Sequence, residues 1–262
     1  MINLDRRRRI LDILEKEGQI TTIELEHRLG VTGATIRSDL REMDREGAIL
    51  RFHGGATLAD QSHLSSPNEN YLKRSVMYVD EKQQIGKAAA KLVEDGQTIF
   101  LDASSTAIHM IPYIQHFDNL TIVTNGIHTA MEIQRCSNFK TMLIGGVLRS
   151  HSGAIEGLFC EEMLQKIMGD TYFVSGNGFS TEAGLTGNNF YELELKRRCK
   201  ERCGKIVALV DSSKLSVNST SSFVAPSEIH TLITDTGISP SQRKEIEARG
   251  IHLIIAGEAE PS

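Results

Sequence analysis

The chain of 262 residues contains no tryptophan, and aromatic residues make up only 5% of it. This scarcity argues against a stacking platform for single-stranded nucleic acid, which depends on aromatic faces. Long apolar runs are missing as well, since no stretch approaches the roughly 18–20 residues of a membrane-spanning helix. The charged N-terminus lacks the apolar segment of a secretory signal. We therefore expect a cytoplasmic protein with no membrane partner.

Patterns typical of disulfides and metal sites are also missing. The four cysteines form no C-x-x-C pair. Cys199 and Cys203 stand an i, i+4 step apart on an expected helix, where we interpret them as reduced core thiols. His109, His116 and His128 lie on expected helices without the spacing of metal ligands. The sequence thus predicts no metal site and no cofactor.

The formal net charge is −5, which at first opposes binding to DNA. The charge is unevenly distributed, however, because residues 1–58 hold ten Lys and Arg against ten Asp and Glu. A neutral domain binds DNA if its basic side chains cluster and its acids face elsewhere. A structural nucleoid protein is disfavoured, because such proteins are basic overall. The length and the apolar fraction of 40% favour a small domain followed by a larger one.

Residues 21–55 carry the clearest local pattern. Thr21 and Glu24 form a capping box at the start of one helix, and Gly30 permits a tight turn after it. Thr32 can cap a second helix. The buried stripe of that helix, at i, i+4 and i+7, consists of Ile36, Leu40 and Met43. Its opposite face presents Thr35, Arg37, Ser38, Arg41 and Arg45.

This arrangement predicts a helix-turn-helix whose second helix enters a major groove with its N-terminal residues leading. A further helix is expected before it, over residues 4–17. An ordinary solvated helical hairpin is the alternative, but the sequence ILRFHGGATL that follows supplies a wing and disfavours it. The residues expected at the DNA are Thr32, Gly33, Thr35, Arg37, Ser38, Arg41, Arg51 and His53.

The rest of the chain has a different pattern. Residues 59–79 are polar and contain Pro67, so we expect a linker there. Over residues 80–258, strands such as TIFL and IVALV alternate with helices, which indicates a mainly parallel sheet covered on both faces. The expected strands are 98–101, 120–124, 141–144, 172–174, 205–210, 231–234 and 251–255. The expected helices are 81–94, 106–115, 127–135, 160–168, 191–203 and 240–249. The predicted fold class is α/β behind a winged helix-turn-helix domain over residues 1–58.

Polar clusters follow five of the expected strands, and parallel sheets bind ligands beyond the carboxyl ends of their strands. Hydroxyls and free N–H groups at a helix start suit an anion, glycines allow close approach, and lysine adds positive charge. Taken singly, these features are N-caps, turns and a solvated lysine, but their recurrence at one edge favours a binding site. The clusters contain Asp102, Ser104, Ser105 and Thr106; Thr124 and Asn125; Gly145, Gly146 and Arg149; Ser175 to Gly178; and Asp211 to Lys214.

Both parts of the chain resemble the DeoR family of bacterial transcription regulators. In the head the resemblance rests on Arg9-Ile10, Glu24-Leu25, Gly30-Val31-Thr32, Thr35-Ile36-Arg37, Asp39-Leu40, Gly47 and the run from Arg51 to Ala56. The family usually has Ser at Thr32 and a second Arg at Ser38. In the second part the family motifs are D-x-G-T-T, T-N, G-G followed by Arg, Glu four residues before Lys-Arg, and D-x-S-K. They match the clusters above together with Glu192, Lys196 and Arg197, although Ser104 and Ser105 replace Gly and Thr.

The resemblance implies a sensor domain related in fold to ribose-5-phosphate isomerase and coenzyme A transferases, with a phosphorylated sugar or related metabolite as effector. The implied effector site consists of Asp102, Ser104, Ser105, Thr106, Thr124, Asn125, Gly145, Gly146, Arg149, Glu192, Lys196 and Lys214. We therefore predict a DNA-binding transcriptional regulator: a repressor of a carbohydrate or sugar-acid catabolic operon, released from its operator by a phosphorylated metabolite. We expect a homodimer or homotetramer.

The rival interpretation is a sugar-phosphate isomerase-like enzyme with a DNA-binding appendage. In that case Asp102, Glu192 and Lys214 would serve as acid, base and phosphate anchor. The sequence shows no nucleophile–base pairing or metal signature to support it, and the resemblance implies a protein without enzymatic activity. We therefore predict that the protein is not an enzyme.

Overall fold

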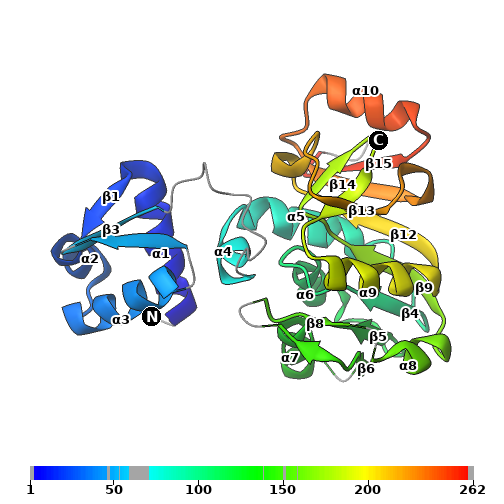
Figure 1. Ribbon diagram of the computed structural model, residues 1–262, viewed down its shortest axis with the longest axis horizontal. Coiled ribbons are helices and arrows are strands. Elements are labelled where there is room, and N and C mark those ends of the chain that lie inside the picture. The colour runs from blue at the N-terminus through cyan, green and yellow to red at the C-terminus, as the bar shows by residue number, and fades with distance from the viewer. Residues whose placement is uncertain are drawn as a thin grey trace. The chain divides into compact units, whose positions relative to one another are not determined.

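The computed structural model describes residues 3–45, 48–52, 54–58, 71–137, 139–149, 152–157 and 159–258. The chain divides into two compact units, Met1–Met77 and Tyr78–Ser262, which we call the head and the sensor unit (Figure 1). Among the described residues, no helix has both the length and the apolar character needed to cross a membrane.

The first part of the head, residues 3–58, combines helices α1, α2 and α3 with a small antiparallel sheet (Figure 1). The helices are α1 (Asn3–Glu17), α2 (Thr22–Leu29) and α3 (Gly33–Arg45). The strands are β1 (Gln19–Thr21), β2 (Ile49–Phe52) and β3 (Gly55–Leu58), in the order β1-β3-β2. The expected wing hairpin therefore has a third strand, β1, which the sequence analysis did not predict. A short helix, α4 (Tyr71–Val76), lies within the range expected as a linker.

The local signals in the head act as predicted. Glu24 N–H donates to Thr21 Oγ1 at 3.3 Å, and Thr21 N–H donates to Glu24 Oε2 at 2.9 Å. Gly30 ends α2 with φ of 64°, a left-handed conformation that glycine adopts without steric cost. Apolar side chains from all three helices then form one core, which includes Ile10, Leu14, Leu25, Leu29, Ile36, Leu40 and Met43.

The sensor unit is built on a seven-stranded sheet with the order β15-β14-β12-β9-β4-β5-β6. The strands are β4 (Thr98–Leu101), β5 (Thr121–Thr124), β6 (Lys140–Leu143), β9 (Gly169–Val174), β12 (Cys203–Leu209), β14 (Thr231–Asp235) and β15 (His252–Ala256). Every neighbouring pair in this sheet is parallel. The predicted α/β class with a parallel sheet is confirmed.

Helices cover both faces of this sheet. Alternate strand residues enter two separate cores, so that Ile99 belongs to one and Phe100 to the other. The first core involves α5 (Val79–Ala90), the 3-10 helix η2 (Ala107–Met110), α6 (Ile111–Ile114) and α7 (Ile127–Cys136). The second involves α8 (Glu161–Gln165), α9 (Phe190–Glu201) and α10 (Pro240–Ala248). Burial on both faces explains why the strands are almost continuously apolar in sequence.

Two features of the sensor unit differ from expectation. A second, antiparallel sheet contains β10 (Gly178–Ser180), β11 (Gly184–Gly187) and β13 (Ser221–Val224), and β7 (Val147–Leu148) pairs with β8 (Ile155–Glu156). These strands are too short to show a hydrophobic period. The helix expected over 106–115 is divided into η2 and α6. Pro112 lies in the first turn of α6, and it lacks the N–H that a continuous helix would use there.

Candidate functional site

The N-terminal end of α3 forms the first candidate surface. Thr35 N–H donates to Thr32 Oγ1 at 3.4 Å, and the two hydroxyls lie 3.0 Å apart, so Thr32 caps the helix as predicted. Arg37, Ser38 and Arg41 are exposed on the outer face, whereas Thr35 is half-buried. The helix therefore presents basic and hydroxyl side chains along one exposed stripe.

Gly33, predicted as a DNA-contact residue, is buried at the first position of α3. A Cβ at this position would lie 1.7 Å from Oε1 of Glu26, on α2. That oxygen is the end of a flexible, half-buried side chain, which can move aside. The role of Gly33 at the DNA therefore stays a prediction.

Ion pairs explain how a neutral head presents a basic surface. Arg6 Nε lies 2.5 Å from Asp39 Oδ2, and Arg7 Nη2 lies 2.6 Å from Glu42 Oε2. Both acids belong to α3 and face α1, so they fasten α3 against the core. Arg37 and Arg41 remain exposed on the opposite face of α3. The head can therefore present a basic surface although its acidic and basic residues are equal in number. Arg51, on β2, is exposed, and His53 lies outside the described residues.

The second candidate site follows from the topology of the seven-stranded sheet. Strands β4, β5 and β6 succeed one another toward one edge, while β9, β12, β14 and β15 run toward the other. The order reverses between β4 and β9, and open parallel sheets bind ligands at such a point. Asp102 follows β4 and Ser175 follows β9. The Ser175 N–H donates to Asp102 Oδ2 at 3.0 Å, which joins the two loops at the point of reversal.

An ion network unites four of the predicted effector-site residues. Lys196 Nζ, on α9, lies 3.0 Å from Asp102 Oδ2 and 3.2 Å from Glu192 Oε1. Glu192 Oε2 lies 3.5 Å from Arg149 Nη1. Lys196 also donates to the Ser175 carbonyl oxygen at 2.9 Å. Residues far apart in sequence are thus brought together at the reversal point.

The charges of this network are fixed by their surroundings. Burial opposes protonation of Lys196, but the carboxylates of Asp102 and Glu192 outweigh it and raise the pKa of Lys196 above its usual value. Asp102 is fully buried. Its oxygens accept the N–H groups of Ser104 at 3.1 Å and Ser175 at 3.0 Å. The Asp102 carboxylate is thus held by two backbone N–H groups as well as by Lys196.

Three predicted residues hold the loops of the site in shape. Ser104 Oγ accepts the backbone N–H of Ala107, and Thr124 Oγ1 accepts that of Gly126. Asn125 Oδ1 accepts the Ala103 N–H at 3.2 Å, and its Nδ2 donates to the Ile155 carbonyl at 3.0 Å. These are N-cap, turn and bracing contacts, which agree with the plainer interpretation of these side chains.

Other residues leave polar groups and space available. Thr106 Oγ1 and Ser175 Oγ are buried, and no residue in the described part of the chain hydrogen-bonds to them. Buried hydroxyls normally have a partner, so the loops that hold Asp102 can accommodate a further polar group. A Cβ at Gly145 would meet no atom within 4 Å, whereas one at Gly146 would lie 2.7 Å from the Glu156 carbonyl oxygen. Gly146 therefore serves packing, while Gly145 borders open space.

Lys214 belongs to a second charged cluster at the end of β12. Its Nζ lies 3.2 Å from Asp211 Oδ2, and the Ser213 hydroxyl donates to the other oxygen of Asp211. Burial opposes ionisation of Asp211, but Lys214, Ser213 and Lys82 together outweigh it and lower the pKa of Asp211. Lys82, on α5, is a buried residue that the sequence analysis missed. Its signal was its place in the apolar stripe of that helix, with Val79, Ile85, Ala89 and Ala90.

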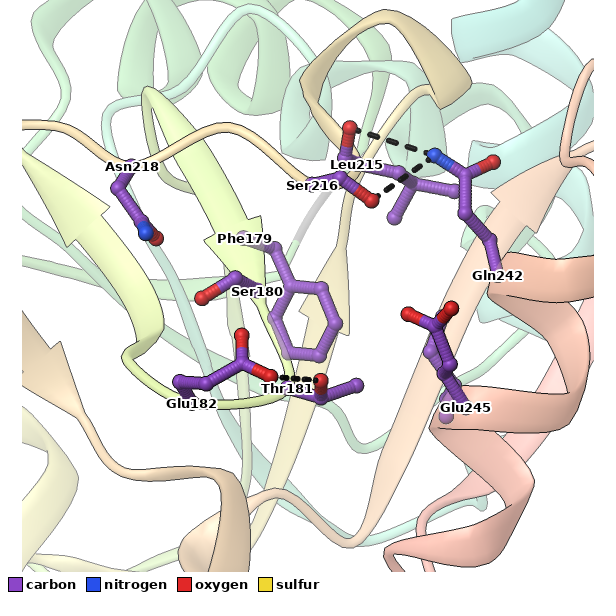
Figure 2. A pocket seen from close by; sticks show the side chains of 10 residues that line it. Phe179, Ser180, Thr181, Glu182, Leu215, Ser216, Asn218, Gln242 and Glu245 are labelled. Carbon is purple, nitrogen blue, oxygen red and sulfur yellow. Dashed lines mark hydrogen bonds between the residues drawn. The ribbon is translucent and has the colours of Figure 1, made fainter.

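A polar pocket of about 140 Å³ is lined in part by Leu215 and Ser216, which follow Lys214 in sequence (Figure 2). Gln242 Nε2 donates to Ser216 Oγ at 3.1 Å and to the Leu215 carbonyl oxygen at 3.4 Å, and Ser216 has a left-handed backbone with φ of 61°. The lining residues include Glu182 and Glu245 but no lysine or arginine. This pocket therefore does not suit an anionic ligand, and the sequence analysis did not predict it.

A winged helix-turn-helix head followed by an α/β unit with a polar site at its sheet edge defines a DNA-binding transcriptional regulator. A family model described as the DeoR-like helix-turn-helix domain matches residues 6–62. Another, described as the DeoR C terminal sensor domain, matches residues 77–236. The chain belongs to the DeoR family, which confirms the resemblance and the regulatory function predicted from the sequence.

Individual relatives agree with this assignment. The chain is 37% identical over 256 residues to the HTH-type transcriptional regulator GolR of Listeria innocua, covering 98% of this chain and 100% of the relative. It is 29% identical over 226 residues to the glycerol-3-phosphate regulon repressor of Escherichia coli, covering 86% and 88%. Among solved structures, ribose 5-phosphate isomerase A of Methanocaldococcus jannaschii gives a TM-score of 0.40 at 19% identity, covering 52% of this chain and 54% of that one. Nothing about function is inferred from so distant a likeness.

Proposed function

We propose that the protein represses an operon for carbohydrate or sugar-acid catabolism and leaves its operator when a phosphorylated metabolite binds the sensor unit. The observation that carries the proposal is the polar cluster at the reversal point between β4 and β9, which has buried hydroxyls without a partner among the described residues. A relative that is named as a repressor of the glycerol-3-phosphate regulon supports both the repressor role and the class of effector.

The head supplies the DNA contacts in this proposal. Arg37 and Ser38, on the exposed face near the start of α3, face base edges in a major groove, together with the hydroxyls of Thr32 and Thr35. Arg41 and the wing residues Arg51 and His53 contact phosphates. Gly33, the first residue of α3, belongs to the same proposed contact surface.

A single head reads too short a stretch of DNA to select one operator. We therefore propose that the protein acts as a homodimer or homotetramer on an operator with paired half-sites, spaced by whole helical turns. Its site of action is the cytoplasm, where the operator DNA is found. A footprint on one isolated half-site, or a monomer at working concentration, would contradict this part of the proposal.

The effector is held at the sheet edge without being converted. The hydroxyls and N–H groups of Ser105 and Thr106 and the ammonium group of Lys214 donate hydrogen bonds to the phosphate. The hydroxyl-bearing part of the metabolite lies at Asp102 and the Lys196 network, with Gly145 leaving room for it. The site includes Ser104, Thr124, Asn125, Gly146, Arg149 and Glu192, which hold its loops and charges in place. The effector can lower the affinity for DNA only if it binds the DNA-free arrangement of the protein more tightly than the DNA-bound arrangement.

The experiment is a release assay on the full-length protein bound to operator DNA. Sugar phosphates and the same sugars without phosphate are titrated in parallel, and stability is followed by thermal shift. We expect only phosphorylated compounds to release the DNA, with a change in operator affinity of roughly five- to 150-fold at saturation. Release by unphosphorylated sugars alone would contradict the phosphate site. Conversion of a bound compound, lost in Glu192→Gln, would favour the isomerase instead.

A further inference from the structure

The seven-stranded sheet of the sensor unit ends in two edge strands, β15 and β6, which differ in exposure. Along β15 only His252 is exposed, whereas Lys140, Thr141 and Leu143 are exposed along β6. Among the described residues, β6 pairs with β5 on one side and with no strand on the other. Such an edge offers unpaired N–H and C=O groups to another strand. Of the two edges, β6 is therefore the better placed to accept one.

A groove of about 710 Å³ lies between β6 and α7, which are neighbours in the sensor unit (Figure 1). Its walls include Met131 on α7, Leu143 on β6 and Phe139 in the segment that joins them. Met131 is 63% exposed and Leu143 is 40% exposed, so the groove of a single chain is open to solvent. Exposed apolar surface beside an open strand edge indicates a docking site for another chain.

The charges around the groove favour one occupant. Among the described residues that line it, there is no Asp, Glu, Lys or Arg. Residues 59–262 nevertheless carry the whole net charge of −5, because residues 1–58 are neutral. Two copies would repel each other through acidic surfaces, and an uncharged groove avoids that repulsion. Lys140 is the only charged residue of β6, and antiparallel pairing of two β6 strands places the two lysines at opposite ends.

Both walls of the groove are continuous with loops of the candidate effector site. Helix α7 starts directly after Thr124, Asn125 and Gly126, and β6 leads to Gly145. The Ile144 N–H donates to the Thr124 carbonyl oxygen at 2.8 Å, which ties the two walls together at that end. In the proposed function, the effector favours one arrangement of a homo-oligomer. A contact between copies at this groove would be joined directly to the loops that hold the effector.

We propose that a second copy of this chain docks at this surface, with its β6 antiparallel to the β6 of the first copy. This inference rests on the proposed function, in which the protein acts as a homodimer or homotetramer. A two-fold axis through the β6 pair makes the contact self-complementary and closes the open edge of both sheets. The two α7 helices then lie on the same face of the joined sheet, and the exposed apolar side chains of both copies leave water together.

The test measures self-association of the full-length protein by sedimentation velocity over a range of concentrations. The unaltered protein should form an even-numbered oligomer. In Met131→Glu, we expect the dissociation constant of this contact to rise at least about 100-fold, because two like charges then enter one apolar interface. Met168→Glu alters another methionine, which is 68% exposed. It is the matched control and should associate as the unaltered protein does.

Two further measurements identify the second copy and the strand. Mixing Met131→Glu with Met131→Lys should restore association to within about tenfold of the unaltered protein, because the interface then holds opposite charges. Hydrogen exchange in β6 should be slow in the oligomer and fast in Met131→Glu, with the protection of β4 unchanged. If Met131→Glu does not fold, Leu143→Glu provides the same test. Its control is then Val217→Glu, at a position that is 42% exposed.

Each outcome supports or overturns the inference. Association unchanged in both Met131→Glu and Leu143→Glu would overturn it. A loss that mixing does not restore would overturn it too, because a contact between copies must respond to the opposite charge. An oligomer in which β6 exchanges as fast as in Met131→Glu would show that the copies join elsewhere. A monomeric unaltered protein would instead contradict the homo-oligomer of the proposed function, and slow exchange of β6 in that monomer would assign the groove to the head of the same chain.

Discussion

The head and the sensor unit use the same device, a buried ion network, for opposite purposes. In the head, Asp39 is 3% exposed and pairs with Arg6, which fastens α3 so that other arginines face outward. In the sensor unit, Lys196 is 7% exposed and pairs with Asp102, which has no exposed surface, inside the candidate site itself. The network of the head lies behind the candidate DNA-binding face of α3, whereas the network of the sensor unit is part of the candidate effector site.

This difference bears on how each unit meets its ligand. The candidate DNA contacts at Arg37 and Arg41 are already exposed, so docking requires little rearrangement of the head. The candidate effector residue Asp102 is buried and already engaged by Lys196 and two backbone N–H groups, so a ligand must take over contacts that the protein now makes with itself. Exchanging such contacts is one physical reason why the effector can bind the DNA-free and DNA-bound arrangements with unequal affinity. That inequality couples the effector site to the DNA-binding surface.

The largest expected effect comes from breaking the sensor network. Lys196→Met would leave Asp102 and Glu192 without their shared cation, and breaking a buried pair costs about 3–5 kcal/mol. The free energy of unfolding of the sensor unit should fall by that amount in urea titrations followed by hydrogen exchange. Lys200→Met is the control, one turn along α9, where the partner Glu228 is 42% exposed; it should cost at most about 1 kcal/mol. Equal losses in the two variants would contradict an enclosed network.

The corresponding change in the head is Asp39→Ala, with a somewhat smaller expected effect. Removing Asp39 takes away the carboxylate that Arg6 contacts at 2.5 Å, while Arg7 keeps Glu42, and we expect a loss of roughly 2–4 kcal/mol confined to the head. Hydrogen exchange in the full chain should show faster exchange in α1 and α3 and unchanged protection in β4 and β9. Glu17→Ala, which breaks the exposed pair with Arg28, is the control and should cost under about 1 kcal/mol. An effect spread over both units would argue against their independence.

The comparison also shows what the sequence can and cannot predict. The head was predictable because its signals are local: the Thr21–Glu24 box, the turn at Gly30 and the stripe of α3 all act within a few residues. In the sensor unit the parallel strands were equally apparent as apolar runs. The reversal of strand order between β4 and β9, which places the candidate site, is a property of the assembled sheet, and no local pattern encodes it.

The misses have the same physical origin. The burial of Gly33 beside the Glu26 side chain was missed, while its predicted role at the DNA stays a prediction. The burial of Lys82 was missed because it depends on how α5 packs on the sheet. The predicted DNA-contact and effector-binding roles themselves remain predictions, because they depend on molecules that bind from outside.

A change confined to the outer face of α3 should affect DNA binding alone. Arg37→Ala removes an exposed side chain near the start of the helix, and we expect a loss of about 1–3 kcal/mol in specific operator binding with the melting temperature unchanged. Arg45→Ala is the matched control at the far end of α3, where its partner is Glu42. Arg41→Ala should lower the slope of log affinity against log salt by about one. Operator binding that survives Arg37→Ala in a folded protein would contradict the docking of α3.

The smallest expected effect concerns the rim of the sensor network. Glu156 is half-buried, and its Oε2 has no hydrogen-bond partner among the described residues. Burial raises the pKa of Glu156, and Glu192 adds to this, although Arg149 opposes it. The ionised form therefore weakens the folded state once the pH rises above the unfolded value, near 4.5.

Replacing Glu156 with a neutral residue should relieve that penalty. In Glu156→Gln we expect a gain of about 0.5–1 kcal/mol in the free energy of unfolding at pH 7, a modest figure because solvent screens a half-buried group. The gain should shrink as the pH falls toward 4.5, because the glutamate of the unaltered protein is protonated first in the folded state and then, near 4.5, in the unfolded state as well. Glu162→Gln, at an exposed position on α8 beside Lys166, is the control without such a gain. A gain that stays constant from pH 7 to pH 4 would show that relief of charge is not its cause, because only the ionised carboxylate carries the penalty.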